Sequence, residues 1–493
     1  MDSGEGQAGI GANLASIIEG HPGDAIALIE DDVRITYGEL RARVVGWRAR
    51  LASLGVTRGS RVVLAAGNEV AFVEAALATL GLGAVAAPIN PYSPAPEAQR
   101  KVASVSPDLV VIGDVAARLR EPDTFDVPVL YASSDGVPES AGTEAPGIVD
   151  TAPGDVAFLL STSGVSGAAK IAMLTHQGMG WVQQSLCGDG PQQLRADDTT
   201  LAVLPVAHIL GLNVALLATL RAGACAVLQR RFDSEQSLAL IAEHGITMVI
   251  GAPPMWHQWA VGAGADDAMA SVRLARSGAA ALRPATADRL QTRFGINVVQ
   301  GYGLTETSSV VTTGRGVDAP ATSAGRPLAD IALVVVDDDG VPVDVGDVGE
   351  VVVRTPGAFA GYLDDPESTA MVLTDDGWLW TGDLGVVDDS GFLHLVDRVK
   401  DIVIVSGFNV YPAEVEEVLM EFPGVRAAVV VGRAHGVTGE TVVAHIAGEV
   451  DTDELDEWMR SQLSTYKCPT AYHLVDEIPT TSAGKALRRE LRA

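Results

Sequence analysis

Cysteine is scarce in this chain of 493 residues, and the few cysteines that occur are far apart. Cys187, Cys225 and Cys468 form no CxxC pair, so the sequence predicts neither a disulfide framework nor a zinc ribbon. Separated thiols of this kind are typical of a reducing compartment, and we therefore expect a cytoplasmic protein.

Positive charge is also in short supply. The chain has 34 lysines and arginines against 63 aspartates and glutamates, which gives a formal net charge of −29 at pH 7. Binding to nucleic acid requires a basic surface that neutralises phosphates, and docking on anionic lipid requires a basic patch. The charge balance argues against both partners and otherwise indicates only a solvated acidic surface.

Long uninterrupted apolar runs are missing as well. The longest apolar stretch, AVLPVAHILGLNVALLATL at 202–220, is interrupted by Pro205, His208, Gly211 and Asn213. A buried strand followed by a helix is therefore favoured over a membrane span, and no integral membrane segment is expected. The amino-terminal segment shows no basic stretch followed by an apolar one, so no secretory signal is predicted.

The chain does have enough apolar residues for a large core, at 47% hydrophobic residues and a mean hydropathy of +0.22. Its length predicts two or more domains. Short β-branched runs alternate with helical segments; SRVVLAAGN at 60–68, for example, precedes EVAFVEAALATLGLG at 69–83. This alternation predicts an α/β fold whose sheets are mostly parallel and flanked by helices.

From about residue 330 the pattern changes to short strands separated by Asp-Gly turns, which predicts a β-rich subdomain of hairpins. The last segment has its own apolar periodicity, with two helices and two longer strands, and predicts a small α+β domain. We place the large amino-terminal domain at 1–396, a charged connector at 397–400 and the small domain at 401–493.

A glycine- and hydroxyl-rich loop stands out at 161–176, STSGVSGAAKIAMLTH, directly after the apolar run DVAFLL. Backbone N–H groups and hydroxyls in such a loop can surround an anion. The spacing from Gly164 to Lys170 does not fit the GxxxxGK[ST] pattern of a P-loop. A second glycine motif, GLGAVA at 81–86, ends a helical run instead of following a strand, so we interpret it as chance.

Four further motifs accompany this loop along the chain. They are GYGLTET at 301–307, GWLWTGDLG at 377–385, DRVKDIVIVSGFNVYPAEVE at 397–416 and PTTSAGKALRREL at 479–491. In this order and spacing the five motifs resemble the adenylate-forming superfamily of acyl-CoA synthetases, peptide-synthetase adenylation domains and luciferases. The resemblance runs from residue 35 to residue 491, and VSGFNVYPAEVE with the following FPGV is most similar to the fatty acyl-CoA synthetase branch.

The resemblance implies a two-step reaction. A carboxylate attacks the α-phosphate of ATP to give an acyl-adenylate and pyrophosphate, and coenzyme A then displaces AMP. Because two anions must meet in the first step, catalysis should consist of charge neutralisation and positioning. The implied catalytic residues are Lys485, Thr305, Glu306 and His208, and Glu306 is also the implied Mg²⁺ ligand. Lys485 would bridge the carboxylate and the α-phosphate.

The resemblance also implies a set of ATP- and AMP-binding residues. They are Thr162, Ser163, Gly164, Ser166, Gly167 and Lys170 in the phosphate loop, Gly278, Ala279 and Ala280 beside adenine, Tyr302, Gly303 and Thr305, Asp383 at the ribose, and Arg398 at the ribose or a phosphate. The family usually has SSGTTGxPKG, whereas this loop has Val165, Ala169 and Ile171 in place of threonine, proline and glycine. Losing one hydroxyl would weaken ATP binding by about tenfold or more.

The small carboxyl-terminal domain is implied to be mobile, with Lys400 as the hinge. Ser406, Gly407 and Phe408 are then implied to line the tunnel for coenzyme A. For the acid we expect a pocket formed by His208, Gly211, Trp256 and Ser277. The three segments that carry these residues supply apolar and small side chains and no lysine or arginine, so we expect a hydrophobic acid, namely a fatty acid.

Other functions stay open at this point. An aryl acid–CoA ligase is the next candidate, because Trp256 and Trp259 would shape a flat slot. An acyl-AMP ligase would use an acyl carrier protein as its partner, and an amino-acid adenylation domain is a further alternative. A nucleotide- or acyl-binding protein without activity is favoured only by the altered phosphate loop. A homodimer is also left open.

Overall fold

The computed structural model describes residues 13–93, 95–119, 125–133, 145–162, 170–314, 319–398, 401–405, 408–435, 439–463, 465–481 and 486–492. Contacts between residues divide the chain into two units. The first unit comprises Met1–Ala332 and Arg354–Leu379, and the second comprises Leu333–Val353 and Trp380–Ala493. The predicted domain boundary at 397–400 stays a prediction, since residues 399 and 400 lie outside the described residues.

The smaller sheet of the first unit has the strand order β6-β5-β3-β4-β7-β8. Its strands are β3 (Arg61–Ala65), β4 (Val85–Pro88), β5 (Leu109–Ile112), β6 (Val129–Tyr131), β7 (Val156–Thr162) and β8 (Lys170–Thr175). All neighbours are parallel except β7 and β8, which form an antiparallel pair. The apolar runs that predicted these strands are explained by burial on both faces, which is typical of parallel sheets.

The larger sheet has the order β15-β14-β13-β12-β11-β9-β10-β1-β2. Its strands are β1 (Ile26–Glu30), β2 (Val33–Thr36), β9 (Thr199–Ala202), β10 (Cys225–Leu228), β11 (Met248–Gly251), β12 (Leu274–Ser277), β13 (Val298–Tyr302), β14 (Thr312–Thr313) and β15 (Arg326–Pro327). The strands from β13 to β1 in this order are parallel, so their carboxyl ends lie along one edge. The predicted α/β fold with mostly parallel sheets is therefore confirmed.

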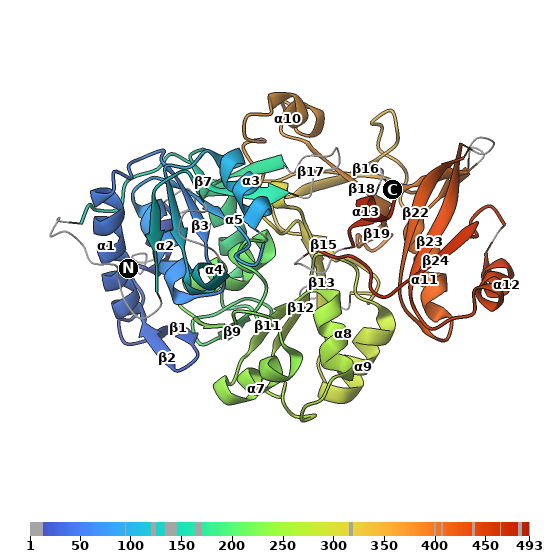
Figure 1. Cartoon of the computed structure of the whole chain (residues 1–493), viewed down its shortest axis with the longest axis horizontal. Coiled ribbons are helices and arrows are strands. Elements are labelled where there is room, and N and C mark those ends of the chain that lie inside the picture. The colour runs from blue at the N-terminus through green and yellow to red at the C-terminus, as the bar shows by residue number, and fades with distance from the viewer. Residues whose placement is uncertain are drawn as a thin grey trace. The chain divides into compact units, whose positions relative to one another are not determined.

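Helices cover both sheets of the first unit (Figure 1). They are α1 (Tyr37–Ser53), α2 (Val70–Gly81), α3 (Ala95–Val105), α4 (Asp114–Leu119), α5 (His176–Leu186), α6 (Ala218–Arg221), α7 (Ser234–His244), α8 (Pro253–Val261), α9 (Pro284–Phe294) and α10 (Pro366–Val372), with short 3₁₀ turns η1 (Leu14–Ile18) and η3 (Thr305–Thr307). Because α2 ends at Gly81 before β4 begins, GLGAVA runs from helix to strand and cannot be a dinucleotide fingerprint.

A π-helical segment, η2 (Leu210–Leu217), follows β9 and lies within the apolar core of the larger sheet. Its second residue, Gly211, packs so closely on the preceding chain that a Cβ would lie 2.4 Å from the carbonyl oxygen of Pro205. Any side chain there would push the segment away from the end of β9. The apolar stretch at 202–220 is thus a buried strand end and helix, as predicted. No helix in the described ranges is both long and apolar enough to span a bilayer.

The second unit contains two sheets. One has the order β16-β17-β18-β19, formed by β16 (Ala332–Val336), β17 (Gly349–Arg354), β18 (Leu379–Val387) and β19 (Leu393–Arg398). The other has the order β21-β20-β23-β22 with β24 beside β23, formed by β20 (Val403–Val405), β21 (Phe408–Val410), β22 (Val425–His435), β23 (Gly439–Gly448) and β24 (Ala471–Val475). Helices α11 (Pro412–Glu421) and α12 (Thr452–Gln462) pack on one face, and Leu491 of α13 (Arg488–Leu491) packs on the other.

One buried histidine makes the first unit sensitive to acid. His176 is 1% exposed, and its Nδ1 accepts a hydrogen bond of 3.1 Å from the backbone N–H of Leu14. Burial lowers the pKa of His176 from 6.5 to about 4, although the nearby carboxylate of Asp155 acts to raise it. Between pH 6.5 and pH 4 this histidine is protonated in the unfolded chain but stays neutral in the folded chain. The free energy of unfolding therefore decreases by roughly 3 kcal/mol as the pH falls from 6.5 to 4.

Replacing this histidine should therefore flatten the pH dependence of stability. In His176→Asn the amide oxygen can accept the same hydrogen bond but cannot be protonated. We expect the variant to be somewhat less stable than the wild type at pH 7, and to lose less stability between pH 6.5 and 4. Urea unfolding at several pH values measures the difference directly. If the free energy of unfolding changed equally with pH in the two proteins, His176 would not be a neutral imidazole in the folded state.

Candidate active site

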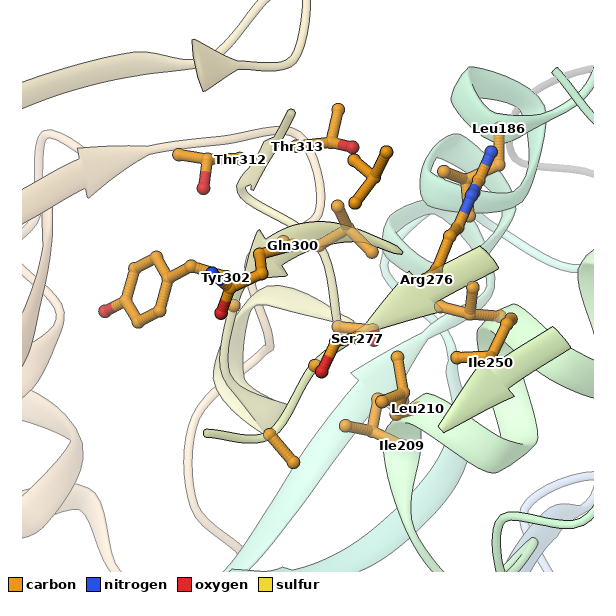
Figure 2. A pocket seen from close by; sticks show the side chains of 18 of the residues that line it. Leu186, Ile209, Leu210, Ile250, Arg276, Ser277, Gln300, Tyr302, Thr312 and Thr313 are labelled. Atoms are coloured by element: carbon orange, nitrogen blue, oxygen red, sulfur yellow. The ribbon is translucent and has the colours of Figure 1, made fainter. Parts of the chain in front are cut away.

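A pocket lies at the carboxyl ends of β9, β11, β12 and β13 in the first unit (Figure 2). It holds about 600 Å³ of empty space, part of which is open to solvent. Ligands of parallel α/β sheets bind at this end of the strands, because the loops there can carry polar groups while the strands stay buried. The pocket brings together residues that the sequence separates by more than a hundred positions.

The turn after β13 carries several of the predicted residues. Tyr302 and Gly303 line the pocket, and Thr305 and Glu306 follow in η3. The turn is tight: a Cβ at Gly303 would lie 1.8 Å from the carbonyl oxygen of Ser309. Ser309 itself has a φ of 110°, which is strained for a residue with a side chain. Such strain is typical of functional sites, where the surrounding structure holds the backbone.

The segment after β12 supplies the small residues that were expected beside adenine. Ser277, Gly278 and Ala279 line the pocket, and the neighbouring Ala280 is exposed. A Cβ at Gly278 would come within 3.0 Å of Leu210, so glycine leaves room between this segment and η2. Ala279 has a φ of 72° and adds a second strained position to the pocket wall.

His208 also lines the pocket, between β9 and η2. Its Nδ1 accepts a hydrogen bond of 3.4 Å from the backbone N–H of Leu210. A neutral imidazole with this bond carries its proton on Nε2. The side chain is half-buried, so His208 can present a donor to a ligand in the pocket.

Two residues expected in the acid pocket lie outside its lining. Trp256 is fully buried, and its indole N–H donates to the carbonyl oxygens of Gly251 (3.1 Å) and Arg276 (3.2 Å). Through these two hydrogen bonds it links the ends of β11 and β12, and its ring packs edge to face with Trp259. Gly211 packs on the chain after β9. The prediction that Trp256 and Trp259 form a flat slot for the acid is therefore wrong, because both rings are part of the hydrophobic core.

The sequence interpretation missed Arg276, which lines the pocket although no arginine was expected there. It occupies the position directly before Ser277 on β12, and the two side chains point to opposite sides in Figure 2. The arginine extends toward Leu186 at the end of α5, and its Nη2 donates to the carbonyl oxygen of Gln192 at 2.6 Å. The signal was present in the sequence as the residue preceding SGAAAL.

The phosphate loop is flanked by β7 and β8. Thr162 and Lys170 are partners across this antiparallel pair, and the Thr162 hydroxyl donates to the Lys170 carbonyl oxygen at 3.4 Å. The intervening residues, including Ser163, Gly164, Ser166 and Gly167, lie outside the described residues. The hairpin therefore brings both ends of the predicted loop together.

Glu306 and Lys170 both contact Tyr362. The Tyr362 hydroxyl donates to Oε1 of Glu306 at 2.7 Å, and Nζ of Lys170 lies 4.9 Å from the centre of the tyrosine ring. Within the described residues no group of three or more His, Cys, Asp or Glu side chains is placed to hold a metal. The role of Glu306 as magnesium ligand stays a prediction, and a single carboxylate fits a cation that takes few protein ligands beside phosphate oxygens.

Two predicted ribose-binding residues belong to the second unit. Asp383 on β18 is paired in register with Arg398 on β19, and its backbone N–H donates to the Thr381 hydroxyl at 3.1 Å. Burial raises the pKa of the neighbouring Glu350; the N–H of Gly382 acts to lower it and the charge of Asp383 to raise it. Lys400, Ser406, Gly407 and Lys485 lie outside the described residues, as do the side chains of Arg398 and Phe408.

Two protein-family models match this chain and together cover most of it. The family model described as "AMP-binding enzyme" matches residues 14–363, and "AMP-binding enzyme C-terminal domain" matches residues 414–485. The chain belongs to the AMP-binding enzyme family. The predicted membership of the adenylate-forming superfamily, and with it the prediction of an enzyme of the CoA-ligase type, is confirmed.

This AMP-binding enzyme is similar over nearly its whole length to proteins of known activity. A (7a-methyl-1,5-dioxo-octahydro-1H-inden-4-yl)propanoyl:CoA ligase of Mycobacterium tuberculosis is 35% identical, over 95% of this chain and 96% of the relative. A feruloyl-CoA synthase of an Amycolatopsis species is 34% identical, over 95% of each. The crystal structure of ATP-bound MatB from Rhodopseudomonas palustris superposes with a TM-score of 0.88 at 30% identity, covering 97% of this chain and 98% of that one.

Proposed function

We propose that this enzyme activates a ring-bearing, oxygenated carboxylic acid with ATP and transfers the acyl group to coenzyme A. Both relatives are named for ring-bearing oxygenated acyl groups, and the similar crystal structure holds ATP. The observation that carries the proposal is the composition of the pocket, in which apolar side chains lead to Arg276. It favours the aryl-type acid over the fatty acid that the motifs suggested.

The chemistry follows from the charges of the reactants. An oxygen of the substrate carboxylate attacks the α-phosphorus of ATP, the bond to the β-phosphate oxygen breaks, and pyrophosphate leaves. In the second step the thiolate of coenzyme A attacks the acyl carbon, and AMP leaves. Thr305 and Lys485 are assigned to the α-phosphate, Glu306 to the magnesium ion that accompanies ATP, and His208 to the substrate carboxylate. Each group neutralises or orients a charge, so no protein nucleophile is required.

Arg276 specifies the kind of acid. Leu186 and Ile250 lie beside the arginine in the pocket and suit a hydrocarbon framework (Figure 2). A methyl-terminated chain that filled this region would place apolar atoms against a guanidinium and remove water from it, which is costly. A ring with a hydroxyl, oxo or carboxylate group at its far end would instead accept a hydrogen bond from the arginine.

Release of AMP, measured with and without coenzyme A, tests the proposal. The acids would be 3-phenylpropanoate, its 4-hydroxy and 4-carboxy derivatives, and octanoate. We expect CoA-dependent AMP formation, with kcat/KM at least tenfold higher for an oxygenated ring acid than for the unsubstituted one. In Arg276→Leu this preference should disappear, because a lost hydrogen bond to a charged group changes discrimination by about that factor.

Arg273→Lys provides a control for this variant, because lysine keeps the positive charge that pairs with the buried Asp198 and loses the guanidinium bonds to the loop. Arg273 holds the same loop, since it donates to the carbonyl oxygens of Pro191 (2.9 Å) and Gln193 (2.8 Å), but it does not line the pocket. Equal loss of preference in both variants would mean that the loop, and not the guanidinium of Arg276, selects the acid. Absence of AMP with every acid would refute the ligase itself, and turnover only with a carrier protein would indicate an acyl-AMP ligase.

A further inference from the structure

Tyr362 lies between two oppositely charged side chains of the first unit. Its hydroxyl donates to the carboxylate of Glu306 at 2.7 Å, while the ammonium group of Lys170 lies 4.9 Å from its ring centre. Lys170 closes the predicted phosphate loop, and Glu306 is the predicted magnesium ligand. The tyrosine is only 8% exposed, so its ring is held in place by the protein.

The backbone around Tyr362 explains why it is held there. The segment 359–363 runs antiparallel to β8, with hydrogen bonds from Met173 N–H to the Gly361 oxygen (3.0 Å) and from Leu363 N–H to the Ile171 oxygen (2.8 Å). At the start of this segment the backbone N–H of Phe359 donates to the backbone carbonyl oxygen of Glu306 at 2.9 Å. One short segment therefore ties the strand that follows the phosphate loop to the turn that carries the magnesium ligand.

Tyr362 contacts both a positive and a negative side chain, Lys170 and Glu306. An ammonium and a carboxylate within reach of one another tend to form an ion pair, which would use up both charges before a ligand arrives. Among the described residues no ion pair joins Lys170 to Glu306. Instead the ammonium group lies over the ring face, with the carboxylate of Asp365 also near enough to interact with it, and the hydroxyl donates to the Glu306 carboxylate.

We infer that Tyr362 is a positioning residue that keeps Lys170 and Glu306 apart and separately oriented for ATP and its magnesium ion. The lysine that would bind the triphosphate is then held over a ring face, and the carboxylate that would bind the magnesium ion accepts the tyrosine hydroxyl through Oε1. This inference rests on the proposed use of ATP, and it concerns how the site is kept ready.

Two substitutions separate the two contacts of the tyrosine. Tyr362→Phe removes the hydroxyl and keeps the ring, whereas Tyr362→Leu removes both and allows Lys170 to reach Glu306. ATP binding to the full-length protein is measured calorimetrically with excess Mg²⁺ and with EDTA. We expect Tyr362→Phe to weaken binding about tenfold with Mg²⁺ and less than twofold with EDTA, and Tyr362→Leu to weaken both by tenfold or more.

Phe359→Leu is the control, because Phe359 lies on the same segment and packs edge-on against Tyr362 at 4.9 Å but touches neither charge. It should lower the melting temperature as much as Tyr362→Leu and leave ATP affinity within twofold of the wild type. The KM for the acid should stay unchanged in all three variants. Equal ATP affinity in wild type and both tyrosine variants would overturn the inference while AMP formation stands; a wild type that binds no ATP would instead refute the proposed function.

Discussion

Lys485→Ala is expected to lower acyl-adenylate formation by about 10²–10³-fold and to leave thioester formation from a supplied acyl-adenylate unchanged. The reason is electrostatic: a carboxylate approaches a phosphate only if a cation lies between them, and one preorganised charge contributes about this factor. After the adenylate has formed, that repulsion no longer exists. Pyrophosphate exchange measures the first step, and release of acyl-CoA from synthetic acyl-adenylate measures the second.

The chain on both sides of the lysine loop is anchored within the second unit. Thr480 and Ala486 pair as an antiparallel bridge, and Leu487 N–H donates to the Pro479 oxygen at 2.8 Å. Just beyond, Arg488 donates to the carbonyl oxygen of Val430 at 2.7 Å and forms a half-buried ion pair with Glu416. Removing the Lys485 side chain should therefore leave the loop's base intact, so that a lost rate reports the missing charge.

Lys467→Ala is the matched control for this substitution. Lys467 belongs to the same unit, and its ammonium pairs with Glu414 at 2.6 Å. Partly exposed pairs of this kind contribute little to stability, so we expect both half-reactions to stay within twofold of the wild type. Equal loss of both half-reactions in Lys485→Ala would remove the assigned role, since a purely electrostatic contribution to adenylation cannot slow thioester formation.

Gly303→Ala should reduce adenylation by at least 100-fold. The added Cβ would lie 1.8 Å from the Ser309 oxygen and 2.6 Å from the Ser309 carbonyl carbon, both of which are backbone atoms. The turn must therefore open, and it carries Thr305 and Glu306 with it. A displacement of about 1 Å in groups that position reacting atoms is enough for a loss of this size. Pyrophosphate exchange at saturating ATP measures the effect on the chemical step.

A second glycine shows whether the loss comes from the turn. Gly154 has no heavy atom within 4 Å of the place where its Cβ would lie, and it is exposed. Gly154→Ala should therefore change neither activity nor melting temperature appreciably. For Gly303→Ala we expect a lower melting temperature as well, because overpacking costs about 1–3 kcal/mol. Full activity in this variant would show that the turn can move without disturbing the site.

Several features of the site could be predicted because their signal is local. GYGLTET follows an apolar strand and therefore lies at a carboxyl end, where β13 indeed places Tyr302 and Gly303 on the pocket. Asp383 and Arg398, assigned to the same ligand from separate motifs, are paired across β18 and β19. The roles assigned to Lys485 and to the residues of the phosphate loop stay predictions.

The errors had a common cause. Trp256 was placed in the acid pocket because its segment supplies apolar side chains, yet apolar composition does not tell whether a ring lines a cavity or packs behind its wall. Arg276 directly precedes the segment of small residues that was assigned to the site, and the sequence alone does not show that its side chain reaches the pocket. At the end of β12 successive side chains point to opposite sides, and both Arg276 and Ser277 reach the pocket.

The sequence by itself determined the α/β class, the order of strands and helices and the family, because apolar periodicity and short motifs depend on neighbours along the chain. Only the tertiary structure decided which arginine lines the pocket and which tyrosine contacts both Lys170 and Glu306. The hydrogen bond between Tyr362 and Glu306 joins residues 56 positions apart. Such a contact exists only after β8, η3 and the segment 359–363 have packed together, and no local pattern encodes it.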